Sequence, residues 1–156
     1  MSLENYLFDL FPNLRRSKYR VTSPATEKYN CVSLVARTTG RVWWPNEHAY
    51  WPPGCRRTEE VRSFVSAFQK SNGFARCGNG TFEPGVEKIA IFSMNDEVQH
   101  VALQPTNRGG LWLSKLGDEH DILHELEALE GGDYGDVACF VSRKIKNKPK
   151  GKRTRS

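Results

Sequence analysis

The chain has 156 residues, 38% of them hydrophobic, and a formal net charge of +5. About 150 residues is the usual size of one compact domain with a real core, so no second domain is required. No window approaches the roughly 18 to 20 apolar residues of a membrane span. The first residues carry Glu4 and Asp9 instead of the long apolar run of a secretory signal. We therefore expect a cytoplasmic protein without membrane contact, while secretion without a signal would leave the same sequence.

The cysteines are scattered and form no CxxC pair; they are Cys31, Cys55, Cys77 and Cys139. The chain is also larger than the small scaffolds that depend on disulfides. We therefore predict reduced thiols and no cofactor.

The positive charge is concentrated in residues 142–156, which hold eight Lys or Arg and no acidic residue. Without them, 15 basic residues face 18 acidic ones. Because a charged segment with Pro149 and Gly151 cannot bury enough apolar surface, we expect disorder beyond about Lys146. The sequence thus predicts one domain at residues 1–141 and a basic tail at 142–156. The tail offers a weak contact to nucleic acid, but it has no interleaved aromatic residues for base stacking, which favours a solvated terminus.

Helices are predicted in the first half of the chain. Leu3–Leu10 has apolar residues at helical spacing and is stopped by Pro12. Asn30 is placed to cap a helix that begins at Cys31 and runs to about Ala36. After a Trp- and Pro-rich loop at residues 41–54, Thr58 is placed to cap a third helix, which Asn72-Gly73 closes. The apolar face of that helix consists of Val61, Phe64, Val65 and Phe68.

Strands dominate the second half. The apolar runs at residues 87–94, 100–104 and 111–116 are separated by short polar turns, which predicts an antiparallel meander. Residues 121–130 then have apolar residues at helical spacing, and residues 136–143 form a last strand. The fold class is therefore α+β, with N-terminal helices packed on an antiparallel sheet.

Cys31 and His100 are the candidate catalytic pair. A cysteine in the first turn of a helix faces unpaired backbone amides, which favour the anionic thiolate and can donate to an oxyanion. A histidine at the start of a strand can lie at the rim of the sheet and act as the general base. These two residues would have to meet where the helix packs on the sheet.

This arrangement resembles the papain-like cysteine hydrolases, especially the small CHAP and NlpC-type amidases and peptidases. In that group a cysteine opens a helix packed on an antiparallel sheet, and the histidine begins a later strand. His100-Val101-Ala102-Leu103, a turn and then Leu111-Trp112-Leu113-Ser114 look like its histidine hairpin. The chain is also similar, over roughly residues 19–143, to a family of small uncharacterised bacterial proteins. The motifs that carry this second resemblance are Tyr29-Asn30-Cys31, the Trp-rich prolines, His100-x-Ala102-x-Gln104, Trp112-x-Ser114-Lys115-Leu116-Gly117, Asp121-Ile122 with His124, and Tyr134-Gly135.

The resemblance implies a third polar residue that orients the imidazole. With the turn inside residues 105–110, antiparallel register places His100 opposite a residue between Ser114 and Gly117, so Ser114 is the nearest candidate. Asp121 is the rival, because a carboxylate is a better partner for an imidazole. For the oxyanion, the amide of Cys31 comes first and the side chain of Asn30 second. Gln104 would share the face of His100 on the strand.

Other interpretations of the same residues remain open. Cys31 can be a small buried hydrophobic residue. His120 and His124, four residues apart on a predicted helix, suggest a metal site with Asp121, but no HExxH-type motif accompanies them, and we predict no metal. His48, Cys55 and Cys77 are spaced too loosely for zinc. The aromatic side chains Trp43, Trp44 and Trp51 can line a substrate groove, or they can plug one end of the core, which is slightly favoured.

We therefore predict a cysteine-dependent hydrolase or acyl transferase that acts on an amide, isopeptide or thioester bond of a protein or peptide. Its activity would be that of a peptidase, amidase or deamidase. The alternative is a catalytically silent papain-like binding module. Such a module would engage protein or nucleic acid through the Trp-rich loop or the basic tail.

Overall fold

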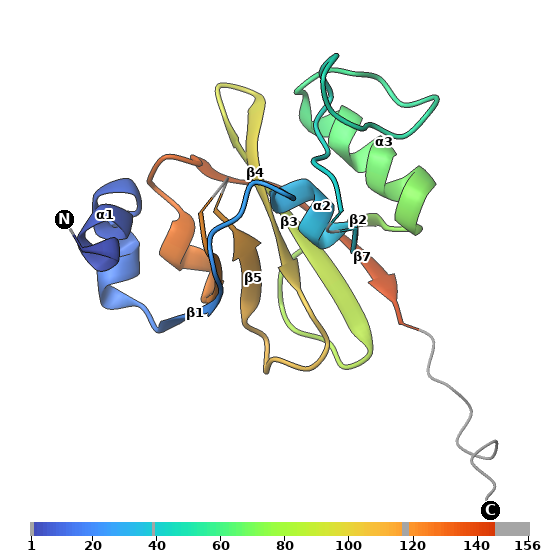
Figure 1. Cartoon of the computed structure of the whole chain (residues 1–156). Coiled ribbons are helices and arrows are strands. Elements are labelled where there is room, and N and C mark those ends of the chain that lie inside the picture. The colour runs from blue at the N-terminus through green and yellow to red at the C-terminus, as the bar shows by residue number, and fades with distance from the viewer. Residues whose placement is uncertain (1, 39, 117–118, 146–156) are drawn as a thin grey trace, which may run out of the picture.

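The structure is a computed structural model, and it describes residues 2–38, 40–116 and 119–145. Its centre is a seven-stranded sheet in the order β1-β6-β5-β4-β3-β7-β2, with every neighbouring pair antiparallel (Figure 1). The strands are β1 (Tyr19–Ser23), β2 (Ala75–Cys77), β3 (Val86–Met94), β4 (Glu97–Gln104), β5 (Trp112–Lys115), β6 (Asp121–His124) and β7 (Asp136–Lys144). The predicted meander is confirmed, because β3, β4 and β5 are consecutive neighbours in the sheet.

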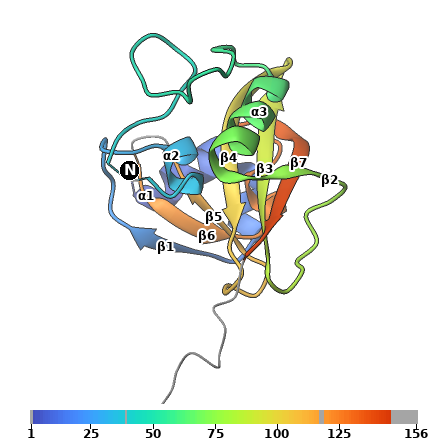
Figure 2. The same ribbon diagram turned by 90° about the vertical axis from the view of Figure 1, so that its right-hand side faces the viewer.

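Helical segments cover both faces of this sheet. They are α1 (Leu3–Leu10), the 3-10 segment η1 (Pro12–Arg16), α2 (Cys31–Val35), α3 (Val61–Asn72) and the 3-10 segment η2 (Leu126–Leu129). Figures 1 and 2 show α1 and α3 on different sides of the sheet. The predicted α+β class is therefore right, although the sheet is the larger part. Within the described ranges, no helix combines the length and apolar character needed to cross a membrane.

Two hydrophobic cores lie on the two faces, because successive side chains of a strand point in opposite directions. On β4, Val101 and Leu103 join the core under α2 and α3, whereas Ala102 joins the core under α1, η1 and η2. His100 has the parity of Ala102, so its ring lies on the α1 side of the sheet. This alternation decides which side chains can meet at the candidate site.

The predicted helix at residues 121–130 is wrong. Asp121–His124 forms β6, whose four residues are all buried and which pairs with β1 on one side and β5 on the other. Only the short η2 follows it. The helical spacing of the apolar residues arose because a doubly paired strand runs directly into a 3-10 turn. Strands β1 and β2 were not predicted, since most of their residues are exposed and carry no apolar alternation.

Two boundaries also differ from the prediction. The N-cap of α3 is Glu60, with no side-chain hydrogen bond, and the Thr58 side chain contacts Ser63 and Glu60 instead. Strand β7 continues to Lys144, and Ser142 pairs with both Ala75 and Lys88. The domain therefore extends past residue 141, and the tail from residue 146 onward lies outside the described residues.

Candidate active site

Cys31 is held at the start of α2 by a reciprocal cap. The Asn30 Oδ1 accepts from the Ser33 amide at 3.1 Å, and the Ser33 hydroxyl accepts from the Asn30 amide at 2.8 Å. The Asn30 Nδ2 donates to the Trp43 carbonyl at 2.7 Å. Because this amide is already used to cap α2 and to hold the Trp-rich loop, the prediction of Asn30 as an oxyanion donor is not supported.

The Cys31 thiol is buried, with 6% of the residue exposed. Burial raises its pKa to about 11, although amides of Val101, Val32 and Cys31 itself hydrogen-bond the sulfur and act in the opposite direction. The helix start favours the anionic thiolate as expected, but burial outweighs this effect at Cys31. Loss of water outweighs a few amide dipoles, because the charged form suffers most from desolvation.

One of these amides locates the Cys31 sulfur on β4. The Val101 amide that donates to the sulfur belongs to the residue directly after His100 on β4. Strands β4 and β5 are paired at Leu103 and Leu113, away from this point. Helix α2 packs against both strands. The Cys31 thiol lies on the α2 side of β4, whereas the His100 ring lies on the opposite side of the same strand. His100 lies in the middle of β4 and not at its start, because β4 begins at Glu97.

A chain of hydrogen bonds fixes the ring of His100. Its Nε2 lies 2.9 Å from the Ser114 hydroxyl, and that hydroxyl lies 2.7 Å from the Nε2 of His124. The Nδ1 of His124 lies 2.6 Å from the carbonyl oxygen of Glu125. His100, Ser114 and His124 are 1%, 0% and 0% exposed. The predicted contact between His100 and Ser114 is confirmed, and His124 extends it by one residue.

This chain of hydrogen bonds also determines which nitrogen of each histidine ring carries a proton. A carbonyl oxygen can only accept, so Nδ1 of His124 donates to Glu125. Burial lowers the pKa of His124 to about 4, so its ring is neutral at pH 7 and its Nε2 must accept the Ser114 proton. The Ser114 oxygen then accepts from Nε2 of His100. Burial also lowers the pKa of His100 well below its usual range. Its neutral ring therefore keeps a free lone pair on Nδ1, the buried atom that has no hydrogen-bond partner.

Tyr134 covers the face of His100. The two rings are stacked, with centroids 4.1 Å apart and planes 4° from parallel. Burial raises the pKa of the Tyr134 phenol, and Cys31 contributes to this shift, so the phenol lies within electrostatic reach of the thiol. The next residue, Gly135, has φ 73° and no room for a side chain, because an added Cβ would be 2.1 Å from the Ser93 carbonyl oxygen. The loop that presents Tyr134 thus requires glycine at this position.

Comparison with known proteins places these residues in a family. Residues 20–142 match the model of a family described as a domain of unknown function, DUF7689. The chain belongs to the DUF7689 family. The matched range contains Cys31, His100, Ser114, His124 and Tyr134. No curated protein and no solved structure matches the chain.

Two other predicted residues of the DUF7689 domain lie elsewhere. Asp121 accepts from the Tyr29 phenol at 2.7 Å through Oδ2, and its Oδ1 has no partner, so it does not orient His100. Gln104 shares the face of His100 but lies at the other end of the meander, where its Nε2 donates to the carbonyl oxygens of Gly80 and Gly110 at 2.9 and 3.2 Å. The predictions of Asp121 as orienter and Gln104 as oxyanion donor are therefore not supported.

The tryptophans that were predicted to line a groove pack in or against the hydrophobic core. Trp43 and Trp51 are 5% and 2% exposed and belong to the core under α2 and α3. Trp44 packs on Phe64 of α3, and its Nε1 donates to Glu59 at 2.7 Å. The interpretation that these residues plug one end of the core is confirmed, and their prediction as walls of a substrate groove is not supported.

The described residues of the DUF7689 domain contain no group of three or more His, Cys, Asp or Glu that could hold a metal ion. His124, suggested above as a possible ligand on a helix, is on β6 and both of its nitrogens are used in the chain described above. Sequence reasoning missed His124 as a partner of Ser114, and Tyr134 as the cover of His100. The register that pairs His124 with Trp112 was hidden by the helix predicted over β6.

Proposed function

We propose that this protein is a cysteine-dependent hydrolase or acyl transferase with a papain-like site, in which Cys31 is the nucleophile and His100 the general base. The observation that carries the proposal is the hydrogen-bond chain from Glu125 to His100, which leaves the free lone pair on Nδ1 of His100. That lone pair belongs to the residue next to Val101, whose amide meets the Cys31 sulfur.

The reaction begins from a neutral pair. His100 Nδ1 takes the thiol proton as the sulfur attacks the carbonyl carbon of an amide, isopeptide or thioester, which gives a tetrahedral oxyanion. Collapse breaks the bond to the leaving group, and the proton on Nδ1 goes to the departing amine or thiolate. The acyl group is then a thioester on Cys31. Water or an amine, deprotonated by Nδ1, attacks this thioester, and the proton returns to the sulfur when it leaves.

Ser114 and His124 are positioning residues in this scheme. They hold the tautomer of His100 that has its lone pair on Nδ1, and the stacked ring of Tyr134 holds the imidazole plane. Among the residues that the structure describes, no carboxylate is hydrogen-bonded to His100, so the imidazolium gains little stabilisation. Proton transfer is therefore expected to accompany the attack on the carbonyl and not to precede it.

A cavity beside Tyr134 is the proposed approach for the substrate. It has a volume of about 270 Å³. Its walls come from α1, the end of β5 and the Tyr134 loop, and they are Tyr6, Leu7, Leu10, Phe11, Leu116, Glu119, Asp133 and Tyr134. Tyr134 links this cavity to the proposed base, because it lines the cavity and also stacks on His100. A cavity of this size takes one side chain of a protein or peptide.

The burial of Cys31 favours a second candidate, a catalytically silent binding module with the same fold. A thiol that is 6% exposed and has a pKa of about 11 is protonated and covered at pH 7. A buried cysteine of this kind can serve as a small core residue. Nucleic-acid binding by the basic tail belongs to this candidate.

Acetyl transfer from p-nitrophenyl acetate separates the two candidates. The enzyme is expected to release p-nitrophenolate in a burst and to carry the acetyl group on the Cys31 peptide, as mass spectrometry of a digest can show. His100→Ala should abolish the burst, whereas the matched control Cys55→Ser should keep it. Circular dichroism checks that each variant is folded. Acetylation of Cys31 at the same rate in the wild type and in folded His100→Ala, or no acetylation at all, would establish the silent module.

A further inference from the structure

A cavity beside β1, the strand at one edge of the sheet, is lined by three positively charged residues. Its volume is about 400 Å³. Lys18 directly precedes β1, Arg20 lies on β1, and Arg108 lies in the turn between β4 and β5. We call it the basic cavity, after these three residues; none of its wall residues belongs to the candidate active site.

Strand pairing holds the β1 side of the cavity. Arg20 is paired with Leu123 of β6, and Leu123 is paired with Leu113 of β5. Cross-strand partners share one face of a sheet, so Arg20 lies next to Leu123, which also lines the cavity. The main-chain amide of Lys18 donates to Oε1 of Glu125 at 3.3 Å, which fixes the chain just before the strand. The backbone at Lys18 and Arg20 is therefore held in place without the use of either positive charge.

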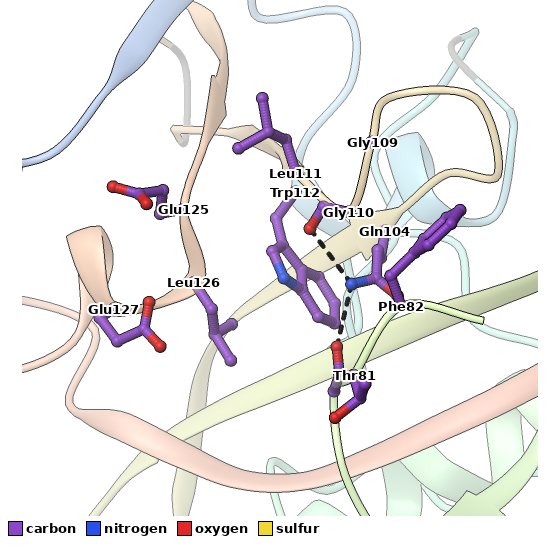
Figure 3. A pocket seen from close by; sticks show the side chains of 11 residues that line it. Thr81, Phe82, Gln104, Gly109, Gly110, Leu111, Trp112, Glu125, Leu126 and Glu127 are labelled. Atoms are coloured by element: carbon purple, nitrogen blue, oxygen red, sulfur yellow. Dashed lines mark hydrogen bonds between the residues drawn. The ribbon is translucent and has the colours of Figure 1, made fainter.

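A glycine-containing turn holds the other side of the cavity. The Leu111 amide donates to the Arg108 carbonyl oxygen at 3.1 Å. Gly109 and Gly110 follow Arg108 with φ of 63° and 91°, a left-handed backbone that favours glycine. At the end of β4, the buried Gln104 donates through Nε2 to the Gly110 carbonyl oxygen at 3.2 Å (Figure 3). Arg108 therefore lies on a turn whose shape is fixed by its own sequence and by a buried amide.

The positive charges of the cavity have no acidic counterpart in its walls. The other wall residues are neutral: Tyr19, Asn107, Leu111 and Leu123. Lys18, Arg20 and Arg108 are exposed, and no salt bridge between residues that the structure describes involves any of them. Outside residues 142–156 the chain has more acidic than basic residues, so three cations around one cavity are a local exception. A cavity lined by one sign of charge concentrates ions of the opposite sign.

Phosphate groups fit this arrangement best. A guanidinium group can donate two parallel hydrogen bonds to one phosphate, and a lysine adds a point charge. Three cations around one cavity match an anion whose charges are close together, whereas the carboxylates of an acidic peptide are spread along its chain. We propose that the basic cavity binds a polyphosphate group, either free or at the end of a nucleotide, through Lys18, Arg20 and Arg108. This site does not involve Cys31, so it does not rest on the proposed hydrolase.

Sodium tripolyphosphate is the probe, titrated into the full chain at fixed ionic strength. The readouts are the backbone NMR signals of Gly109 and Gly110, which report on the cavity and not on the basic tail. We expect saturable shifts of both signals. Arg20→Gln and Arg108→Gln should each weaken binding by about tenfold, or about 1.4 kcal/mol, because each removes a charged donor. The matched control Arg76→Gln removes the same charge from an exposed position on β2, at the opposite edge of the sheet, and should leave binding unchanged.

Two further ligands define the chemistry of the site. ATP separates the two sources of the group: tighter binding of ATP than of tripolyphosphate indicates the end of a nucleotide, and equal or weaker binding indicates free polyphosphate. A single-stranded oligonucleotide without terminal phosphates carries its charges one per nucleotide and should bind the cavity at least tenfold more weakly than tripolyphosphate. The proposal is overturned if tripolyphosphate produces no saturable shift, if the oligonucleotide binds as tightly, or if Arg20→Gln and Arg108→Gln change the affinity no more than Arg76→Gln does.

Discussion

The thiol of Cys31 shows two opposing effects at one residue. Its position at the start of α2 brings amides to the sulfur, while the surrounding core removes water from it. Burial wins, and the pKa rises to about 11. The alkylation of Cys31 by iodoacetamide is therefore expected to be slow at pH 7 and to accelerate up to about pH 11, because the thiolate is the reactive form. Peptide mass spectrometry after timed labelling gives the rate at each pH. A plateau below pH 8 would contradict the prediction.

Ser114 is the residue that links two buried histidines. Ser114→Ala leaves Nε2 of both rings without a partner, and each buried unpaired group costs roughly 1–3 kcal/mol. We expect a loss of stability in urea and a fall of roughly tenfold or more in the maximal rate of Cys31 acetylation, because His100 is no longer held in one tautomer. The concentration of acetyl donor for half-maximal rate should not change. Ser114→Thr, which keeps the hydroxyl, should restore the rate; a variant without restoration would argue for a purely structural role.

At the residue scale, sequence reasoning found Cys31, His100 and Ser114 but not their surroundings. Residue types and hairpin register are local properties, and they sufficed to bring Ser114 to His100. Burial is a property of the whole fold, so the high pKa of Cys31 could not be predicted from its helix start. Tyr134 reaches His100 from a distant loop, and neither residue carries a sign of that contact.

At the element scale, strands β3 and β7 are joined by a buried ion pair. The Glu87 side chain is fully buried, and Arg143 donates to its Oε1 through Nε at 2.9 Å and Nη2 at 2.7 Å. Arg37 contacts the other carboxylate oxygen. Arg143 also donates to the Asn72 carbonyl at 2.7 Å, which ties the end of α3 to β7. Arg143, assigned from its charge to the basic tail, is thus part of the sheet.

Arg143→Ala is expected to destabilise the domain by roughly 3 kcal/mol, because it leaves Glu87 buried with one partner fewer. Arg62→Ala is the matched control. Its pair with Glu60 spans 3.2 Å between side chains that are 65% and 47% exposed, so about 0–1 kcal/mol is expected. Urea unfolding followed by fluorescence gives both values. Equal losses in the two variants would show that Arg143 acts as a surface charge.

The elements that were predicted correctly have a simple property in common. Helix α1 and the meander strands are defined by local apolar spacing and by short turns. Strand β6 is different, because it is held between β5, the strand just before it, and β1, which lies near the start of the chain. A four-residue buried strand has too few residues for its period to be distinguished from that of a helix.

At the scale of the whole molecule, the candidate site depends on both faces of the sheet. Cys31 belongs to the core under α2 and α3, while His100 and its partners lie with the core under α1, η1 and η2. The Cys31 sulfur lies at Val101 of β4, and Tyr134 reaches the neighbouring His100 from the loop before β7. Cys31 is therefore fixed by one core, and the hydrogen-bonded residues His100, Ser114 and His124 lie with the other.

Burying two neutral histidines has a consequence for the stability of the whole domain. The pKa of His124 falls to about 4 and that of His100 falls well below its usual range, in both cases through burial. Between the unfolded value near 6.5 and the lower folded values, the unfolded chain binds more protons than the native protein. The contribution of these two rings to the free energy of unfolding is thus fully present above about pH 6.5 and is lost as the pH falls. Each ring contributes a slope of up to about 1.4 kcal/mol per pH unit.

Urea unfolding at a series of pH values from 7 to 5 measures this slope, and the change in bound protons follows from it directly. His124→Gln removes one of the two titrating rings while its side-chain amide can still face Ser114 and Glu125, so the slope should fall by about one proton. His48→Gln is the control, because its exposed ring stays in water in both states and its loss should leave the slope unchanged. A free energy of unfolding that is flat over this range would mean that His100 or His124 gains a proton inside the folded protein. The assignment of the lone pair to Nδ1 of His100 would then be wrong, because it requires both rings to be neutral.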